Sequence, residues 1–145
     1  MVTSKQCFEV FGIPDRAMEM KHLVLWDVPT AINILIPTIP NKIYCNKQIV
    51  EPLTRAFTNI IDRCLTAEVK TWDGCFNIRA KRGSDSYSLH SWAIAIDINA
   101  AWNGFGAKPQ MSAAMVKCFT DAGFDWGGTW SIKDGMHFQI AKLKN

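Results

Sequence analysis

Large apolar side chains alternate with small or polar ones between residues 92 and 99. The large side chains occupy the even positions, Trp92, Ile94, Ile96 and Ile98. The odd positions hold Ala93, Ala95, Asp97 and Asn99. A period of two is typical of a β-strand, and the large side chains predict that one face of this strand lies in the core. We therefore expect Asp97 to lie far from bulk water, where an unpaired carboxylate is costly and needs a cation or hydrogen-bond donors.

Two other segments have helical spacing. After Glu51-Pro52, where proline suits a first helical turn, an amphipathic helix is predicted from Glu51 to Cys64, with apolar positions at Leu53, Ala56, Phe57, Ile60, Ile61 and Cys64. A second helix is predicted after Ser112, which can cap it. Met111 would pack on Val116 at its start, Gly123 would close its end, and the inward positions would be Met115, Val116 and Phe119.

The N-terminal third differs from the rest of the chain. Prolines at positions 14, 29, 37 and 40 predict irregular structure with short elements in residues 1–45, wrapped on a core formed by residues 46–145. A chain of 145 residues with 48% hydrophobic and 20% charged residues is the size of one globular domain. The predicted fold class is α+β, with a small antiparallel sheet and flanking helices.

A second short strand is predicted near the C-terminus. Gly127-Gly128 and Asp134-Gly135 are turn signals, and residues 136–141 alternate as a closing strand. His137 and Gln139 share one face of this strand, opposite Phe138 and Ile140. His137 then faces the same region as Asp97.

These segments supply the donors of a metal site. His90 has the opposite parity to Asp97, so both reach one site only if the chain turns or bulges between His90 and Ala93. Two imidazoles and a carboxylate, here His90, His137 and Asp97, are the ligand set of a catalytic zinc ion, which keeps a fourth position open. Asp134 precedes His137 by three residues across a glycine turn and is the candidate general base.

The order of these residues resembles a family, the zinc D-Ala-D-Ala carboxypeptidases and L-Ala-D-Glu endopeptidases of bacterial cell walls. The family includes vancomycin-resistance type enzymes and bacteriophage endolysins. Its pattern is Ser-x-His, two residues, Gly-x-Ala-x-Asp, and later an acid, two residues and His. The matching positions are Ser88, His90, Ala95, Asp97, Asp134 and His137. Ala93 stands in place of the glycine, a change that we expect a strand to accept. The resemblance covers about residues 74–140.

The resemblance implies a Hedgehog/D,D-peptidase-like zinc peptidase fold, with Zn²⁺ held by His90, Asp97 and His137 and with Asp134 as catalytic base. It also implies an arginine, on a strand upstream of the first histidine, that binds substrate and stabilises the oxyanion. Residues 75–79 read as such a strand, with Arg79 opposite two apolar positions, so this role is given to Arg79. Arg82 is the competitor, and its simpler interpretation is a solvated charge in a turn.

The implied substrate is the peptide stem of bacterial peptidoglycan. A phage endolysin of the L-Ala-D-Glu endopeptidase type is favoured. The alternatives are a D-Ala-D-Ala carboxypeptidase and a non-catalytic wall-binding or virion-associated module. Six charged residues between Lys5 and Lys21 interrupt any apolar signal sequence, and the apolar run at 31–39 is too short for a bilayer. We expect a monomer that is not membrane-embedded, is made in the host cytoplasm and acts on the wall after release.

The remaining features predict little further chemistry. A net charge of +3 suits an anionic surface but does not indicate nucleic-acid binding. The five cysteines form no metal-binding pair and are expected as buried thiols, although Cys75 is an alternative nucleophile for a Cys-His peptidase. His22 is predicted to be structural, Trp92 to lie in the core, and Trp126 and Trp130 either to line the cleft or to pack inside.

Overall fold

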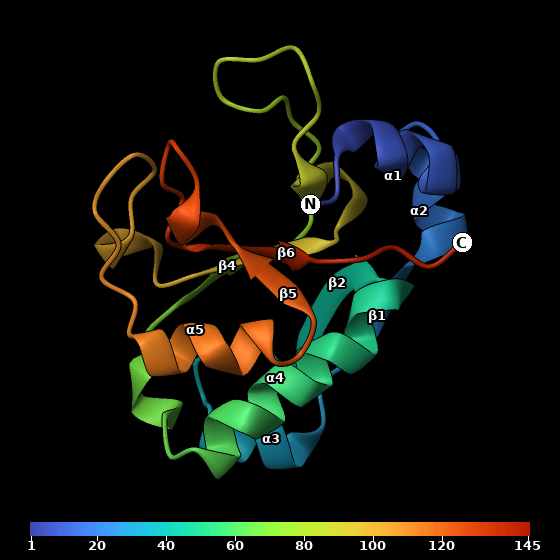
Figure 1. The fold of residues 1–145 in the computed structure, drawn as a ribbon. Helices are drawn as coiled ribbons and strands as arrows, with labels where there is room; N and C mark the ends of the chain where they lie inside the picture. The colour runs from blue at the N-terminus through green and yellow to red at the C-terminus, as the bar shows by residue number, and fades with distance from the viewer.

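The computed structural model describes residues 1–145 and is an α+β fold (Figure 1). The α-helices are α1 (Ser4–Phe11), α2 (Arg16–His22), α3 (Thr30–Leu35), α4 (Val50–Asp62) and α5 (Ala113–Thr120). The strands are β1 (Leu23–Asp27), β2 (Lys42–Asn46), β3 (Trp72–Gly74), β4 (Ala95–Ile98), β5 (Phe124–Trp126) and β6 (His137–Ile140). Short 3-10 helices complete the chain: η1 (Lys47–Ile49), η2 (Thr66–Glu68), η3 (Leu89–Trp92), η4 (Ala100–Trp102) and η5 (Gly127–Thr129).

Two antiparallel sheets organise these elements. β1 and β2 form a two-stranded sheet, and the other four strands form a second sheet in the order β3-β4-β6-β5. β4 and β6 therefore occupy the centre of the larger sheet. The predicted antiparallel sheet with flanking helices is confirmed.

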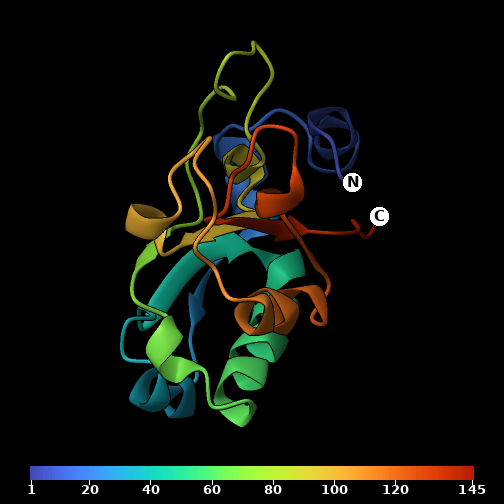
Figure 2. The ribbon, with the colours of Figure 1, turned by 60° about the vertical axis from the view of Figure 1, so that its left-hand side comes forward.

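The larger sheet separates a helical layer from a layer of loops. Both views show α4 and α5 on one side of it, while the long connections around residues 79–87, 99–110 and 127–136 rise on the other (Figures 1 and 2). On the helical side, Phe138 of β6 stacks on Phe119 of α5 with ring centroids 4.2 Å apart. Successive strand residues point to opposite faces, so His137 and Gln139 point to the loop side.

The two predicted helices are present, with one correction. Ser112 caps α5 by accepting a hydrogen bond from the Met115 backbone N–H, as predicted. The first predicted helix is α4, which ends at Asp62, two residues earlier than expected. Cys64 follows with a φ of 58° and is exposed, so its assignment to the apolar face was wrong. The chain reverses there, which removes Cys64 from the helical pattern.

The predicted strand over residues 92–99 is shorter than expected. β4 covers only Ala95–Ile98, because Ala93 adopts the left-handed conformation with φ 54° and ψ 36° after the 3-10 turn of η3. The core prediction nevertheless holds, since Trp92 and Ile94 are fully buried. The predicted strand over residues 75–79 was wrong. β3 ends at Gly74, whose φ is +132°, and the chain beyond it is irregular, with Ile78 exposed.

Residues 1–45 contain α1, α2, β1, α3 and most of β2. This segment contacts the loop layer at several points: the Ser4 hydroxyl donates to the Tyr87 carbonyl at 2.6 Å, and the Trp92 indole donates to the Gly12 carbonyl at 2.8 Å. Its description as a wrap on a separate core stays a prediction. None of the helices combines the length and hydropathy needed to cross a lipid bilayer.

Candidate metal centre

His90 is positioned by the turn that precedes β4. Ser88 caps η3, because its hydroxyl accepts a hydrogen bond from the His90 N–H at 3.3 Å. The left-handed Ala93 then redirects the chain into β4. His90 thus lies in the segment that enters the strand, which confirms the predicted turn between His90 and Ala93. The same geometry explains why the family pattern has glycine at the position of Ala93, since glycine adopts a positive φ without strain.

Asp97 and His137 are brought together by the sheet. They are direct partners in the antiparallel register of β4 and β6, and their side chains share the loop face. His137 Nδ1 lies 3.5 Å from Asp97 Oδ1, and His90 Nε2 lies 3.2 Å from Asp97 Oδ2. The two imidazoles meet with Nε2 of His90 3.2 Å from Nδ1 of His137. The structure therefore gathers the three predicted ligands into one buried cluster.

A backbone carbonyl fixes the tautomer of His90. Nδ1 of this residue lies 2.7 Å from the Cys75 carbonyl oxygen, which can only accept a hydrogen bond. Nδ1 must therefore carry the proton, and Nε2 keeps a free lone pair. That lone pair faces Asp97 and His137.

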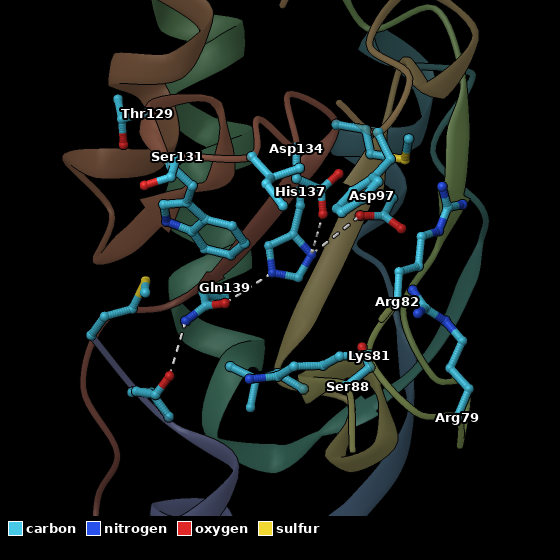
Figure 3. Close-up of a pocket in the computed structure, with 17 residues that line it drawn as sticks. Arg79, Lys81, Arg82, Ser88, Asp97, Thr129, Ser131, Asp134, His137 and Gln139 are labelled. Carbon is cyan, nitrogen blue, oxygen red and sulfur yellow. Dashed lines mark hydrogen bonds and ion pairs between the residues drawn. The ribbon is translucent and has the colours of Figure 1, made fainter. Parts of the chain in front are cut away.

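A side-chain amide does the same for His137. Gln139 donates its amide N–H to the Val2 carbonyl at 3.3 Å, which turns the amide oxygen towards His137. His137 Nε2 lies 2.9 Å from this oxygen and is therefore the protonated nitrogen. Nδ1 of His137 keeps its lone pair and points towards Asp97 and Asp134 (Figure 3). It also lies 3.2 Å from Nε2 of His90.

The donor set fits a divalent cation. One ligand atom from each of His90, Asp97 and His137 lies within 4.8 Å of the others. Asp97 Oδ1 is buried and has no hydrogen-bond partner, which is costly for a carboxylate oxygen unless a cation neutralises it. Two imidazole lone pairs facing each other at 3.2 Å likewise require a proton or a metal ion between them. Both observations indicate that the cluster can hold a metal.

The electrostatics of the cluster agree with this interpretation. Burial opposes the charged form of His90, but the hydrogen bond and charge of Asp97 outweigh it and raise the His90 pKa. Burial also opposes the ionised form of Asp97, yet the neighbouring imidazoles of His137 and His90, when they carry a proton, hold its pKa well below the usual range. Asp97 is thus an anion that attracts a positive charge to this position.

Asp134 lies at the edge of the cluster. Its Oδ2 is 3.9 Å from His137 Nδ1. Burial raises the Asp134 pKa, and the charge of Asp97 adds to the rise against the opposing charges of the histidines and Arg82. A carboxyl group with a raised pKa beside a metal site is a candidate to accept and return a proton.

Two glycines hold the backbone of Asp134. The Asp134 N–H donates to the Gly127 carbonyl at 2.9 Å, and a Cβ added to Gly127 would lie 2.5 Å from the Asp134 carbonyl oxygen. A Cβ added to Gly135 would lie 2.9 Å from the Pro109 side chain. These contacts leave no room for larger residues, so the two turn signals of the sequence also position the candidate base.

A cleft of about 680 Å³ opens over Asp97, Asp134 and His137, which is within the range of ligand-binding pockets. Basic side chains, Arg79, Lys81 and Arg82, lie along one wall (Figure 3). Apolar and aromatic side chains form much of the rest: Met1, Val2, Leu89, Phe105, Trp130, Ile132 and Met136.

Both candidate arginines line this cleft. Arg79 is exposed, and its guanidinium donates only to the Ala80 carbonyl at 3.5 Å, which leaves most of its donors available. Arg82 is also exposed, and its guanidinium carbon lies 4.9 Å from the centroid of the Phe105 ring. Arg82 is thus an exposed turn residue, as in its simpler interpretation, with one aromatic contact, and the choice between the two arginines stays a prediction.

The other candidates divide between structural and cleft positions. Trp130 lines the cleft with its ring centroid 5.2 Å from that of His137. Trp126 instead borders a neighbouring hollow and donates to the Gly135 carbonyl. His22 packs edge-on against Phe11, in agreement with a structural role.

The alternative nucleophile Cys75 is not suited to that role. Its thiol is buried, and burial raises its pKa well above the usual range. Cys75 contributes to the site through its backbone carbonyl, which accepts the hydrogen bond from His90 Nδ1. A pattern of side chains could not predict this contact. Gln139 was also missed as a site residue. The alternating pattern of the strand does place Gln139 on the same face as His137. The hydrogen bond between the two side chains could not be predicted from that pattern.

Comparison with known families agrees with the site. Residues 82–140 match the family model described as D-alanyl-D-alanine carboxypeptidase. The matched segment contains His90, Asp97, Asp134 and His137, so the family resemblance found in the sequence is confirmed over this segment. Neither the curated proteins nor the solved structures gave a match to the chain.

Proposed function

We propose that this protein is a zinc-dependent peptidase that cleaves the peptide stem of peptidoglycan. The observation that carries the proposal is the convergence of two imidazole lone pairs and the orphaned Asp97 Oδ1 on one point at the floor of a cleft. Nitrogen and carboxylate donors in this combination suit zinc, and three protein ligands leave a coordination position for chemistry. The match over residues 82–140 supports a fold of the Hedgehog/D,D-peptidase type.

Bound zinc would polarise the peptide carbonyl and acidify a water molecule at the site. The Asp134 carboxylate accepts a proton from this water as its oxygen attacks the carbonyl carbon. The same carboxyl group then returns the proton to the nitrogen of the breaking C–N bond, so that an amine and a carboxylic acid form, and the acid then loses its proton to water. Asp134 Oδ2 lies 3.9 Å from His137 Nδ1, which places the carboxyl group beside the proposed ligands.

Arg79 stabilises the charge on the carbonyl oxygen in this proposal, as the resemblance implies. Arg82 lies on the same wall of the cleft and is the alternative. Arg79→Ala and Arg82→Ala form a matched pair, since both side chains are exposed. We expect the larger loss of kcat in Arg79→Ala, and a larger loss in Arg82→Ala would transfer the role to Arg82.

Cleavage within the stem, as in an L-Ala-D-Glu endopeptidase, is the favoured specificity. The cleft adjoins a second hollow of about 380 Å³, with which it shares Met1, Thr129 and Trp130. This continuity supports a substrate that extends beyond the cleft on the side of Trp130. The basic wall formed by Arg79, Lys81 and Arg82 favours a second candidate, a D-Ala-D-Ala carboxypeptidase, because such an enzyme must bind a free carboxylate.

A phage endolysin that is made in the host cytoplasm and acts after release is proposed on the family resemblance alone. Digestion of purified peptidoglycan, with and without a chelator, followed by mass analysis tests the activity. New amino-terminal D-Glu would show an endopeptidase, and released D-Ala a carboxypeptidase. The absence of any chelator-sensitive product would overturn the proposed function and leave a non-catalytic wall-binding module.

A further inference from the structure

A chain of hydrogen bonds runs from the N-terminal segment to the buried side of His137. The Val2 carbonyl accepts from the Gln139 amide, and the Gln139 oxygen accepts from His137 Nε2 at 2.9 Å (Figure 3). Val2, Gln139 and His137 are 5%, 2% and 5% exposed, although all three border the cleft, so each group depends mainly on its protein partner. The Val2 carbonyl can only accept a hydrogen bond, so the Gln139 amide nitrogen must donate to it. The Gln139 amide oxygen then faces His137 and accepts from Nε2.

The position of Val2 is itself fixed by the fold. Thr3 caps α1 through a reciprocal pair of hydrogen bonds with Gln6. The neighbouring Ser4 hydroxyl donates to the Tyr87 carbonyl at 2.6 Å. Val2 therefore presents its carbonyl from an anchored segment, far from His137 in the sequence but adjacent to it in space.

We propose that Gln139 is a positioning residue of the metal centre and that the Val2 carbonyl orients it. By accepting from Nε2 of His137, Gln139 holds the imidazole in the tautomer whose Nδ1 is free to bind the metal, and fixes the ring plane. A partner of this kind raises the basicity of a ligand histidine, and its loss typically weakens metal binding by about 10- to 100-fold. This inference rests on the proposed metal function.

The substitution Gln139→Leu keeps a side chain of similar size but removes the oxygen that accepts from His137. Gln139→Glu keeps an accepting oxygen but has no N–H to donate to the Val2 carbonyl. We expect zinc affinity, measured by competition with a chromophoric chelator, to fall about 10- to 100-fold in Gln139→Leu and by less in Gln139→Glu, which keeps the acceptor for His137 but loses the orienting contact with Val2. A purely structural role for the amide would give equal losses in both variants.

A second readout is independent of the metal. Nitrogen-15 NMR of the chelator-treated wild type should show His137 with its proton on Nε2, and Gln139→Leu should show a mixture of tautomers. Unchanged zinc affinity together with an unchanged tautomer in Gln139→Leu would overturn the inference. Failure of the wild type to bind zinc would instead overturn the proposed function, and the tautomer would still report on Gln139.

Discussion

Asp97 and His137 are cross-strand partners in β4 and β6, so a single register pair supplies two of the three candidate metal ligands. A slip of β6 by one residue would send His137 to the helical face, where Phe138 stacks on Phe119, and would leave Asp97 without its partner. The core on one side of the sheet therefore fixes the geometry of the site on the other. The third ligand, His90, lies outside these strands and is positioned by the turn at Ala93.

The first prediction concerns Asp134. The substitution Asp134→Asn keeps the size of the side chain but removes the proton acceptor, so kcat on purified peptidoglycan should fall by about 10²- to 10⁴-fold. Zinc affinity should remain within a few-fold of the wild type, because Asp134 is not among the three clustered ligands. Parallel measurement of turnover and zinc binding checks this. Full activity in Asp134→Asn would exclude Asp134 as the base.

Gly127 offers a test of positioning. In Gly127→Ala the new Cβ would lie 2.5 Å from the Asp134 carbonyl oxygen, so the backbone of Asp134 must shift. Misplacement of a reacting group by about 1 Å can cost about 100-fold in rate, and we expect kcat to fall by that order. Gly104→Ala is the matched control, since a Cβ at Gly104 meets nothing within 4 Å. Equal kinetics in the two variants would contradict the account.

The left-handed Ala93 makes a prediction for stability. Ala93→Gly relieves about 1 kcal/mol of backbone strain but removes a buried methyl group worth about 0.8 kcal/mol, so its free energy of unfolding should match the wild type closely. Ala93→Val places a β-branched side chain at a positive φ in a fully buried position, and we expect a loss of about 2 kcal/mol or more. Urea denaturation compares the three proteins. A stable Ala93→Val would mean that the turn is not left-handed.

Buried thiols predict a loss of stability at alkaline pH. Burial raises the pKa of Cys7 and of Cys45 to about 12, whereas the pKa of an unfolded thiol is about 8.5. Above that pH the unfolded chain releases protons that the folded protein keeps, so each thiol lowers the free energy of unfolding by about 1.4 kcal/mol per pH unit. Urea denaturation between pH 8 and pH 10 measures this slope.

The matched control for the alkaline slope is Cys7→Ala, which should have a smaller slope than the wild type. Reaction with a disulfide reagent at pH 8 supplies an independent check. Only the exposed Cys64 should react quickly in the native protein. Rapid reaction of several thiols would contradict the burial.

The sequence predicted the structure best where metal-binding residue types fall within a clear hydrophobic pattern. The alternation around Asp97 and the spacing of His90, Asp134 and His137 predicted the cluster, because these residue types are rarely placed together in this order. The strand predicted at residues 75–79 failed because Gly74 takes a positive φ and ends β3, an outcome set by local backbone geometry. The roles of the Cys75 carbonyl and of Val2 depend on contacts between distant segments, which no local pattern encodes.

The central claim is that His90, Asp97 and His137 hold a catalytic zinc ion. Crystals of the zinc-loaded protein, measured at the zinc absorption edge, locate the ion directly by anomalous scattering. The account predicts one strong peak about 2.0–2.2 Å from His90 Nε2, His137 Nδ1 and a carboxylate oxygen of Asp97, with a further position open to the cleft. A peak elsewhere, or an ion enclosed by four protein ligands, would contradict it.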